Sequence, residues 1–303
     1  VVRAGGMRRA SEKLHVTQPA ISARMRLLER ELGVELFDRV GRGVRASKAG
    51  LLLLEEIPHI LAAENALRER LDEFRGLEQG SLQIASIDAV SIYVLPEIYL
   101  QFRAAHPGID LRVQVTDSSH VLHAVRELEA EVGFLALPAH PNQLTEEPDL
   151  EFHAIFEDVM VCVAAPDHPL AKRRKVSLQD LASSPLVLYD RTSTTRAILN
   201  TVFERAGVQP NVAMETASPE AMKRLAQVGM GITILPEALV RDDIKGRSLS
   251  HIKLANARFE RLLAIVLRRD RRLGPATRDF LERVRQRFPA PGGGQAKRKK
   301  PRR

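Results

Sequence analysis

The sequence predicts an α/β protein with a small helical region at its N-terminus and two α/β lobes behind it. Three observations carry this prediction. Residues 7–40 place apolar side chains at helical spacing between glycine breaks, and residues 47–77 continue with one long apolar stripe. From residue 80 onward, strand-like and helix-like segments alternate, which is typical of parallel sheets covered by helices. With 303 residues, the chain is long enough for two or three domains with substantial cores.

Two short helices and a hairpin are expected first, over residues 1–46. The segment "MRRASEKLHV" has helical spacing, and "TQPAISARMRLLERELG" places Ile21, Met25, Leu28 and Leu32 on one face before Gly33 ends it. The glycine-jointed segment "DRVGRGVRAS" predicts a hairpin. A helix, a tight turn and a second helix led by polar residues form a helix-turn-helix, and the hairpin would be its wing.

A long linker helix is expected next, within residues 47–79, where Pro58 should kink it or limit its first part. The body, residues 80–288, then repeats the β-α alternation twice. We expect one lobe at about 80–157 plus 257–288 and a second lobe at about 158–256. The final segment, "PAPGGGQAKRKKPRR", is expected to be a disordered basic tail over residues 289–303.

The charge is concentrated at the two ends of the chain. The net charge is +8, residues 1–50 carry a net +6, and residues 297–303 carry another +6, which leaves −4 for the remainder. Basic ends on a mildly acidic body suggest a polyanion bound at those ends, although a basic end can also be an ordinary solvated surface.

The second predicted helix has the residues for reading DNA. Thr17 can cap it, and Pro19 fits its first turn because the missing N–H costs nothing there. Gln can bond adenine edges, Arg can bond guanine or phosphate, and Ser can bond either. A helical hairpin that packs on a partner protein remains the alternative at this point. The candidate DNA contacts are Thr17, Gln18, Pro19, Ser22, Arg24, Arg26 and, on the wing, Arg39, Arg42 and Arg45.

The segment "ASEKLHVTQPAISARMRLLERELGVELFDRVGRGVRASKAG" resembles the DNA-binding head of LysR-type transcriptional regulators. The similarity continues through "VLPEIYLQFRAAHPGIDLRV", "PDHPLAKRRKVSLQDLA", "YDRTSTTR" and "VGMGITILPEAL", and it covers residues 5–288. The resemblance implies a winged helix-turn-helix, a helix that pairs two chains, and a two-lobed effector domain resembling type 2 periplasmic binding proteins. It also implies a homodimer or homotetramer that binds double-stranded promoter or operator DNA and meets RNA polymerase if it activates. No cofactor is expected, and the single cysteine fits a cytoplasmic location.

The sequence departs from the family pattern in three places. The family usually has another helical turn or more ahead of "VVRAGGM", so most of the first helix of the head is expected to be missing here. Pro58 is unusual in the linker helix, and the basic tail extends past the usual ending. The tail would either add non-specific phosphate affinity or be inert.

A small-molecule effector would bind between the lobes, at strand ends and helix N-termini. Asp88, after the first strand of the body, would either cap the next helix or present a carboxylate to an amine or hydroxyl. The hydroxyls of "YDRTSTTR" gather at a helix N-terminus and suit an anion, so an amino acid or another small acid is expected. The candidate effector contacts are Ile87, Asp88, Ala89, Thr192, Ser193, Thr194, Thr195, Thr216 and Ser218, the last two more often cap groups; Arg196 would help or face solvent.

Other classes of protein lack support in the sequence. The sequence contains no nucleophile elbow, phosphate loop, dinucleotide fingerprint or metal-ligand spacing. This argues against an enzyme, and we predict no catalytic and no metal-binding residues. A solute-binding receptor without DNA function is the other alternative, and the basic head argues against it. The single cysteine, Cys162, excludes a disulfide framework, and no apolar run is long enough for a membrane span.

Overall fold

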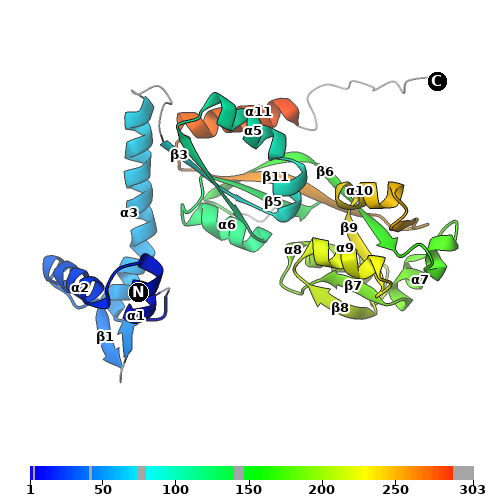
Figure 1. Cartoon of the computed structure of the whole chain (residues 1–303), viewed down its shortest axis with the longest axis horizontal. Coiled ribbons are helices and arrows are strands. Elements are labelled where there is room, and N and C mark those ends of the chain that lie inside the picture. The colour runs from blue at the N-terminus through cyan, green and yellow to red at the C-terminus, as the bar shows by residue number, and fades with distance from the viewer. Residues whose placement is uncertain (3, 41–42, 74–79, 140–146, 289–303) are drawn as a thin grey trace. The chain divides into compact units, whose positions relative to one another are not determined.

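The computed structural model describes residues 1–2, 4–40, 43–73, 80–139 and 147–288 (Figure 1). The predicted tail at 289–303 therefore lies outside the described residues. The chain divides into two compact units, Val1–Asn65 and Ala66–Arg303. Within the described residues, no helix has the length and apolar character needed to cross a membrane.

The first unit is a helical head with a two-stranded wing. Its two short helices are joined at His15, which has a left-handed backbone with φ of 51°. The strands pair antiparallel, so the hairpin expected from the glycines is present. The last helix begins in this unit and runs without interruption past Pro58, so this proline does not limit its first part. The elements are α1 (Met7–Leu14), α2 (Gln18–Leu32), β1 (Phe37–Val40), β2 (Gly43–Ala46) and α3 (Lys48–Glu73).

The start of α3 is held tightly against the segment that leads into the wing. The Ser47 backbone N–H donates to the Leu36 carbonyl at 3.0 Å, and its hydroxyl donates to the Glu35 carbonyl at 2.7 Å. The same hydroxyl accepts from the Gly50 N–H at 3.1 Å. Gly50 faces the Leu36 carbonyl so closely that a Cβ there would lie 2.2 Å from the oxygen. Glycine is therefore required where the helix meets the wing.

The first lobe of the body covers a parallel three-stranded sheet with helices. Its strands pair in the order β4-β3-β5, and its core includes Phe280, whose ring centroid lies 5.5 Å from that of Phe102 and 6.3 Å from that of Phe134. The helix-like segment "VSIYVLPEIYLQFRAAH" belongs to two helices, because the chain turns at Val94–Leu95 and a new helix starts at Pro96. The elements are β3 (Gly80–Ser86), α4 (Asp88–Tyr93), α5 (Pro96–Ala105), β4 (Ile109–Val115), α6 (Ser118–Arg126), β5 (Val132–Pro138) and, from the end of the chain, α11 (Pro275–Arg287).

The second lobe repeats this plan with its own core. Its parallel strands pair in the order β9-β7-β8, and a short strand, β10, pairs with β6. The elements are η2 (Pro169–Lys172), α7 (Leu178–Ser183), β7 (Leu186–Tyr189), α8 (Thr194–Arg205), β8 (Val212–Thr216), α9 (Pro219–Gln227), β9 (Ile232–Pro236), α10 (Glu237–Lys245) and β10 (Ser250–Ile252).

Two long strands join the lobes (Figure 1). The strand β6 (Leu150–Ala164) pairs with β11 (Phe259–Arg268) along its first part and with β9 and β10 along its last part. Along β6, Ile155 belongs to the core of the first lobe and Met160 to the core of the second. Both strands run antiparallel to their neighbours in the adjacent sheets, so one sheet of nine strands continues through both lobes.

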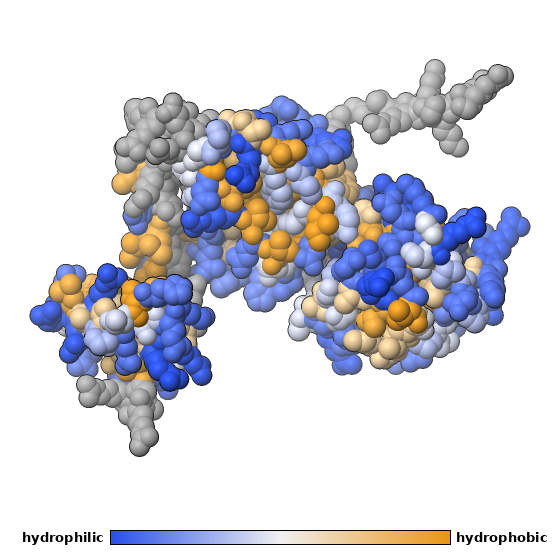
Figure 2. Space-filling view, in the orientation of Figure 1, coloured by the Kyte–Doolittle hydropathy of each residue, from blue (hydrophilic) through white to orange (hydrophobic). Residues whose placement is uncertain are grey.

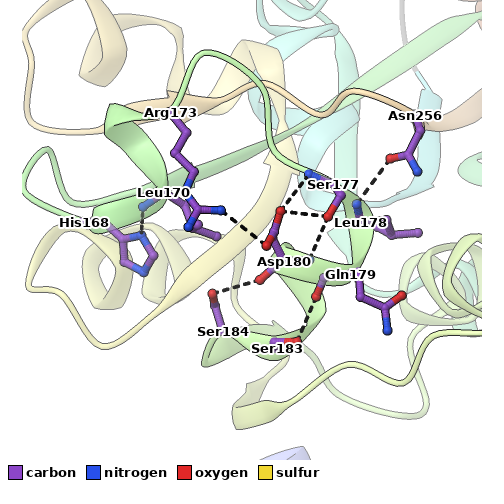
Figure 3. A network of polar contacts seen from close by, with 10 residues as sticks. All are labelled: His168, Leu170, Arg173, Ser177, Leu178, Gln179, Asp180, Ser183, Ser184 and Asn256. Atoms are coloured by element: carbon purple, nitrogen blue, oxygen red, sulfur yellow. Dashed lines mark hydrogen bonds and ion pairs between the residues drawn. The ribbon is translucent and has the colours of Figure 1, made fainter.

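The start of α7 shows how local residues define an element in the second lobe. Ser177 accepts from the Asp180 N–H at 3.1 Å, and the Asp180 carboxylate accepts from the Ser177 N–H and hydroxyl (Figure 3). This reciprocal capping box satisfies N–H groups that a helix start leaves open. Arg173 binds the same carboxylate at 3.3 Å, and Asn256 accepts from the Leu178 N–H.

Candidate functional site

The turn between α1 and α2 places the polar start of α2 at the surface. Thr17 occupies the N-cap position with extended backbone, and its carbonyl accepts from the N–H groups of Ala20 and Ile21. Its side chain makes no capping hydrogen bond, so the expected Thr17 cap is made by the backbone alone. Pro19 is the second residue of the helix, where a missing N–H leaves no partner unsatisfied.

The two faces of α2 differ in the way that the apolar spacing predicts. Ile21 is buried, and Gln18, Arg24 and Arg26 are exposed, with Ser22 between these extremes. The Arg26 guanidinium donates to the Ser22 carbonyl at 3.3 Å, which directs this side chain along the helix.

Three of the candidate DNA contacts share one groove. Gln18, Ser22 and Arg26 line a groove of about 1160 Å³ together with Arg8 and Arg9 of α1. The two α1 arginines were not among the predicted contacts, although the basic pair in "MRRAS" at the start of a helix was a signal for them. The groove also has an acidic rim and reaches the wing, and its further lining residues include Glu29, Glu35, Asp38 and Val44.

Arg24 lies away from this group. It lines a separate, apolar groove of about 460 Å³, whose other lining residues include Leu14, Val16, Met25 and Leu53. Residues two positions apart on a helix point to opposite sides, so Arg24 and Arg26 cannot serve one groove.

The wing presents one described cation. Arg45 is exposed and lies opposite Asp38 in the β1–β2 pairing. Arg39 belongs to β1, but its side chain is outside the described part of the chain, as is all of Arg42.

In the body, the first predicted effector segment follows β3. Ile87 is the N-cap of α4 and is buried, Asp88 is the first residue of the helix, and Ala89 packs against the core of the first lobe. Asp88 therefore does not cap α4, which corrects one of the two roles expected for it. Burial raises the pKa of the Asp88 carboxyl above its usual value.

The second predicted segment follows β7 and leads into α8. Asp190 accepts from the backbone N–H and the hydroxyl of Thr192 and so forms the turn. Ser193 is the N-cap of α8, but its side chain makes no capping bond, and Thr194 is the first residue of the helix. Thr195 is 7% exposed, and its hydroxyl accepts from the Arg261 guanidinium at 2.8 Å.

Arg196 does not face solvent, which was one of the two expectations for it. It is 5% exposed, and its guanidinium donates to the Tyr189 carbonyl at 2.7 Å, to Glu215 at 3.1 Å and to Asn200 at 2.9 Å. Arg196 thus ties α8 to the ends of β7 and β8. The two remaining candidates are Thr216 and Ser218. The Thr216 hydroxyl accepts from the Ser218 N–H in a turn, and the Ser218 hydroxyl caps α9 by accepting from the Ala221 N–H.

Titratable groups from both lobes gather near Tyr189, at the end of β7. Burial raises the pKa of the Tyr189 phenol to about 12, and the charges of Arg261, Asp158 and Asp88 also act on it. Asp88 follows β3 of the first lobe, whereas Tyr189 ends β7 of the second. The two predicted effector segments therefore approach the same group of side chains.

Comparisons with known proteins identify the family of both parts of the chain. The family described as "LysR substrate binding domain" matches residues 75–289, and "Bacterial regulatory helix-turn-helix protein, lysR family" matches residues 1–51. The Escherichia coli K12 protein named "Uncharacterized HTH-type transcriptional regulator YeiE" is 32% identical over 282 residues, which cover 93% of this chain and 92% of YeiE.

Two solved structures share the fold. CbnR, solved as a full-length protein complexed with its target DNA, has a TM-score of 0.65 at 23% identity and covers 95% of this chain and 96% of its own. The Synechocystis PCC6803 CcmR regulatory domain in complex with 2-PG has a TM-score of 0.63 at 24% identity, covering 70% of this chain and 98% of its own.

The chain belongs to the LysR family of transcriptional regulators. It is a DNA-binding regulator with a helix-turn-helix head and an effector-binding domain, and not an enzyme. The resemblance drawn from the head motif and the predicted fold class are thereby confirmed.

Proposed function

We propose that this regulator reads operator DNA with the groove formed by α1 and α2. Gln18 and Ser22 would bond base edges in the major groove, and Arg26, with Arg8 and Arg9, would bond guanine or phosphate. The observation that carries this proposal is that Gln18, Ser22 and Arg26 line one exposed groove at the start of α2.

The other candidate contacts would position the head on the duplex. Thr17 and Pro19 shape the start of α2, so their proposed role is to expose its first turn to the phosphate backbone. Arg24 lies on another side of α2, and we propose at most a phosphate contact for it. Cations on a hairpin suit phosphates or a minor groove, and the wing residues concerned are Arg39, Arg42 and Arg45.

Retention of genomic fragments by the full chain tests the DNA proposal. We expect enrichment of a few promoter sites that carry a two-fold-related motif. Gln18→Ala should relax the preference at one base position, whereas Gln179→Ala should not. Gln179 is a matched control because it is an exposed glutamine in the first turn of a helix in the second lobe. Diffuse retention that disappears at moderate salt would contradict sequence-specific binding.

We further propose that a small amphoteric molecule, such as an amino acid, is the effector between the lobes. The first turn of α8, at Thr194 and Thr195, suits an anionic group because its side-chain cap is absent. Asp88 would receive an amine or hydroxyl, with Ile87 and Ala89 beside it and Thr192, Ser193, Thr216 and Ser218 at the rim. In support, the CcmR regulatory domain was solved with the small molecule 2-PG.

A carboxylate at Asp88 makes a specific test possible. Asp88→Asn should weaken binding of an amino acid relative to the matching carboxylic acid without the amine, because the carboxylate no longer balances the ammonium. Equal effects on both compounds would contradict an amine contact at Asp88. Screening the twenty amino acids for a shift in melting temperature of the full chain would identify the compound to use.

The α3 helix supports the proposal of a homodimer, with a homotetramer as its larger form. Five of its apolar side chains are between 48% and 61% exposed, which is more than a helix of a monomer usually leaves open. Figure 2 shows this apolar surface along α3. The residues are Leu51, Leu52, Ile60, Leu61 and Leu67. We place the regulator in the cytoplasm with its DNA, where it would meet RNA polymerase if it activates transcription.

A further inference from the structure

A buried ion pair lies where the two long strands pass from one core to the other. Arg261 of β11 donates from Nε to Asp158 Oδ2 of β6 at 2.8 Å, and the two side chains are only 3% and 10% exposed. On β11, Phe259 belongs to the core of the second lobe and Leu262 to the core of the first. The pair therefore sits at the connection between the lobes.

Arg261 also reaches the start of α8. Its Nη1 donates to the Thr195 hydroxyl at 2.8 Å, and α8 packs against both β5 and β11. A guanidinium can only donate hydrogen bonds, so the hydroxyl oxygen must act as the acceptor. The hydrogen of the Thr195 hydroxyl is then directed elsewhere, and Thr195 can act as a donor to a third group.

The start of α8 leaves backbone donors without acceptors. Arg261 itself is engaged, since its buried Nη2 forms an ion pair with Asp158 Oδ2 at 2.8 Å. The first N–H groups of α8 have no partner within the helix, and Ser193 does not cap them. Buried donors without acceptors cost free energy, and an anionic ligand would supply the missing acceptors.

We propose that Arg261 is a positioning residue for the effector. Held by Asp158, it orients the Thr195 hydroxyl as a donor to the anionic group of the ligand, and it connects that contact to the strands between the lobes. The inference rests on the proposed effector site at α8. The inference adds that Arg261 on β11, 66 residues after Thr195 in the sequence, gives the site its preference for an anion.

A purely structural role for Arg261 is the competing explanation, because breaking any buried ion pair destabilises a fold. The first lobe offers a control that also combines an arginine, a threonine and a buried carboxylate. Thr277 donates to Glu131 at 2.7 Å, and Arg271 lies 3.9 Å from the same carboxylate with a side chain that is 9% exposed. Arg271→Lys should lower the melting temperature without changing ligand binding.

The test measures binding of inorganic phosphate to the full chain by titration calorimetry. Thr195→Val should weaken phosphate binding about tenfold, and Thr195→Ser should restore it. Arg261→Lys should also weaken it about tenfold, because one ammonium cannot hold both Asp158 and Thr195. The double variant should be no weaker than either single variant, since both remove the same contact. DNA affinity without phosphate should stay unchanged in all of them.

Each contrary outcome has its own meaning. If Thr195→Val weakens phosphate binding and Arg261→Lys does not, or if their effects multiply, the positioning role is wrong and the effector site stands. If the wild type and Thr195→Val bind phosphate equally, or if the wild type binds DNA but no phosphate, both the effector site at α8 and the role of Arg261 are wrong. The assignment to the LysR family is unaffected by either result.

Discussion

Replacing Gly50 by alanine tests the way in which the head is built. The new Cβ would lie 2.2 Å from the Leu36 carbonyl oxygen. Carbon atoms pack at about 3.5 Å or more, so helix α3 and the segment before the wing would have to separate by more than about 1 Å. That displacement removes the hydrogen bond from the Ser47 N–H to the Leu36 carbonyl.

The cost follows from these two effects. Overpacking of this kind costs about 1–3 kcal/mol and a lost hydrogen bond about 0.5–1.5 kcal/mol, which together give about 1.5–4.5 kcal/mol. The equilibrium for local opening of the head should therefore rise about 10- to 2000-fold. We also expect weaker DNA binding, because the wing follows from the displaced segment.

Hydrogen exchange of the amides in the first turns of α3 measures this opening directly. Gly231→Ala is the matched control, because its Cβ would lie 2.5 Å from the Pro185 carbonyl in the second lobe. It should accelerate exchange in the second lobe and leave α3 and DNA binding unaffected. The reasoning would be refuted if the α3 amides of the Gly50→Ala variant exchanged at the wild-type rate and its DNA affinity were unchanged.

Three further predictions concern DNA recognition, pH and the core. Gln18→Ala should cost about 1–3 kcal/mol at one base position, whereas Arg24→Ala should weaken binding to all sequences alike, as salt-dependent binding curves would show. Burial alone would raise the pKa of Asp117, but hydrogen bonds from Ser119 and His120 outweigh it and lower the pKa to about 2. The ionised Asp117 carboxylate therefore stabilises the folded state above pH 3.8, and this contribution is lost as the pH falls toward 2. In acid unfolding, the Asp117→Ala variant should not show this loss of stability between pH 3.8 and 2. Phe280→Ala should destabilise the first lobe by about 3–5 kcal/mol in denaturant melts, and an unchanged midpoint would contradict the packing described for this ring.

Local features of the sequence predicted much of the head. The spacing of Ile21, Met25 and Leu28 fixed the inner face of α2, and Pro19 and Gly33 marked its ends. The separation of Arg24 from Arg26 was also available from helical geometry, since two positions rotate a side chain by more than half a turn. The break at Pro96 could likewise have been read from proline alone.

The two candidate effector segments were chosen by their position after strands, but the contacts of their side chains could not be predicted in this way. Thr195 and Arg196 belong to one hydroxyl-rich and basic stretch, yet both side chains are buried. Their partners, Arg261 and Glu215, are distant in sequence, so no local pattern could have shown which hydroxyl accepts a hydrogen bond and which arginine is already engaged.

The sequence by itself determined the family, the helix-turn-helix and the alternation of strands and helices, because periodicity, caps and breaks act within one or two turns of chain. Only the tertiary structure decided that Gln18, Ser22 and Arg26 share a groove with Arg8 and Arg9, and that a buried ion pair on β6 and β11 reaches the start of α8. These contacts depend on how separate elements pack, and packing brings together residues that no spacing along the chain relates.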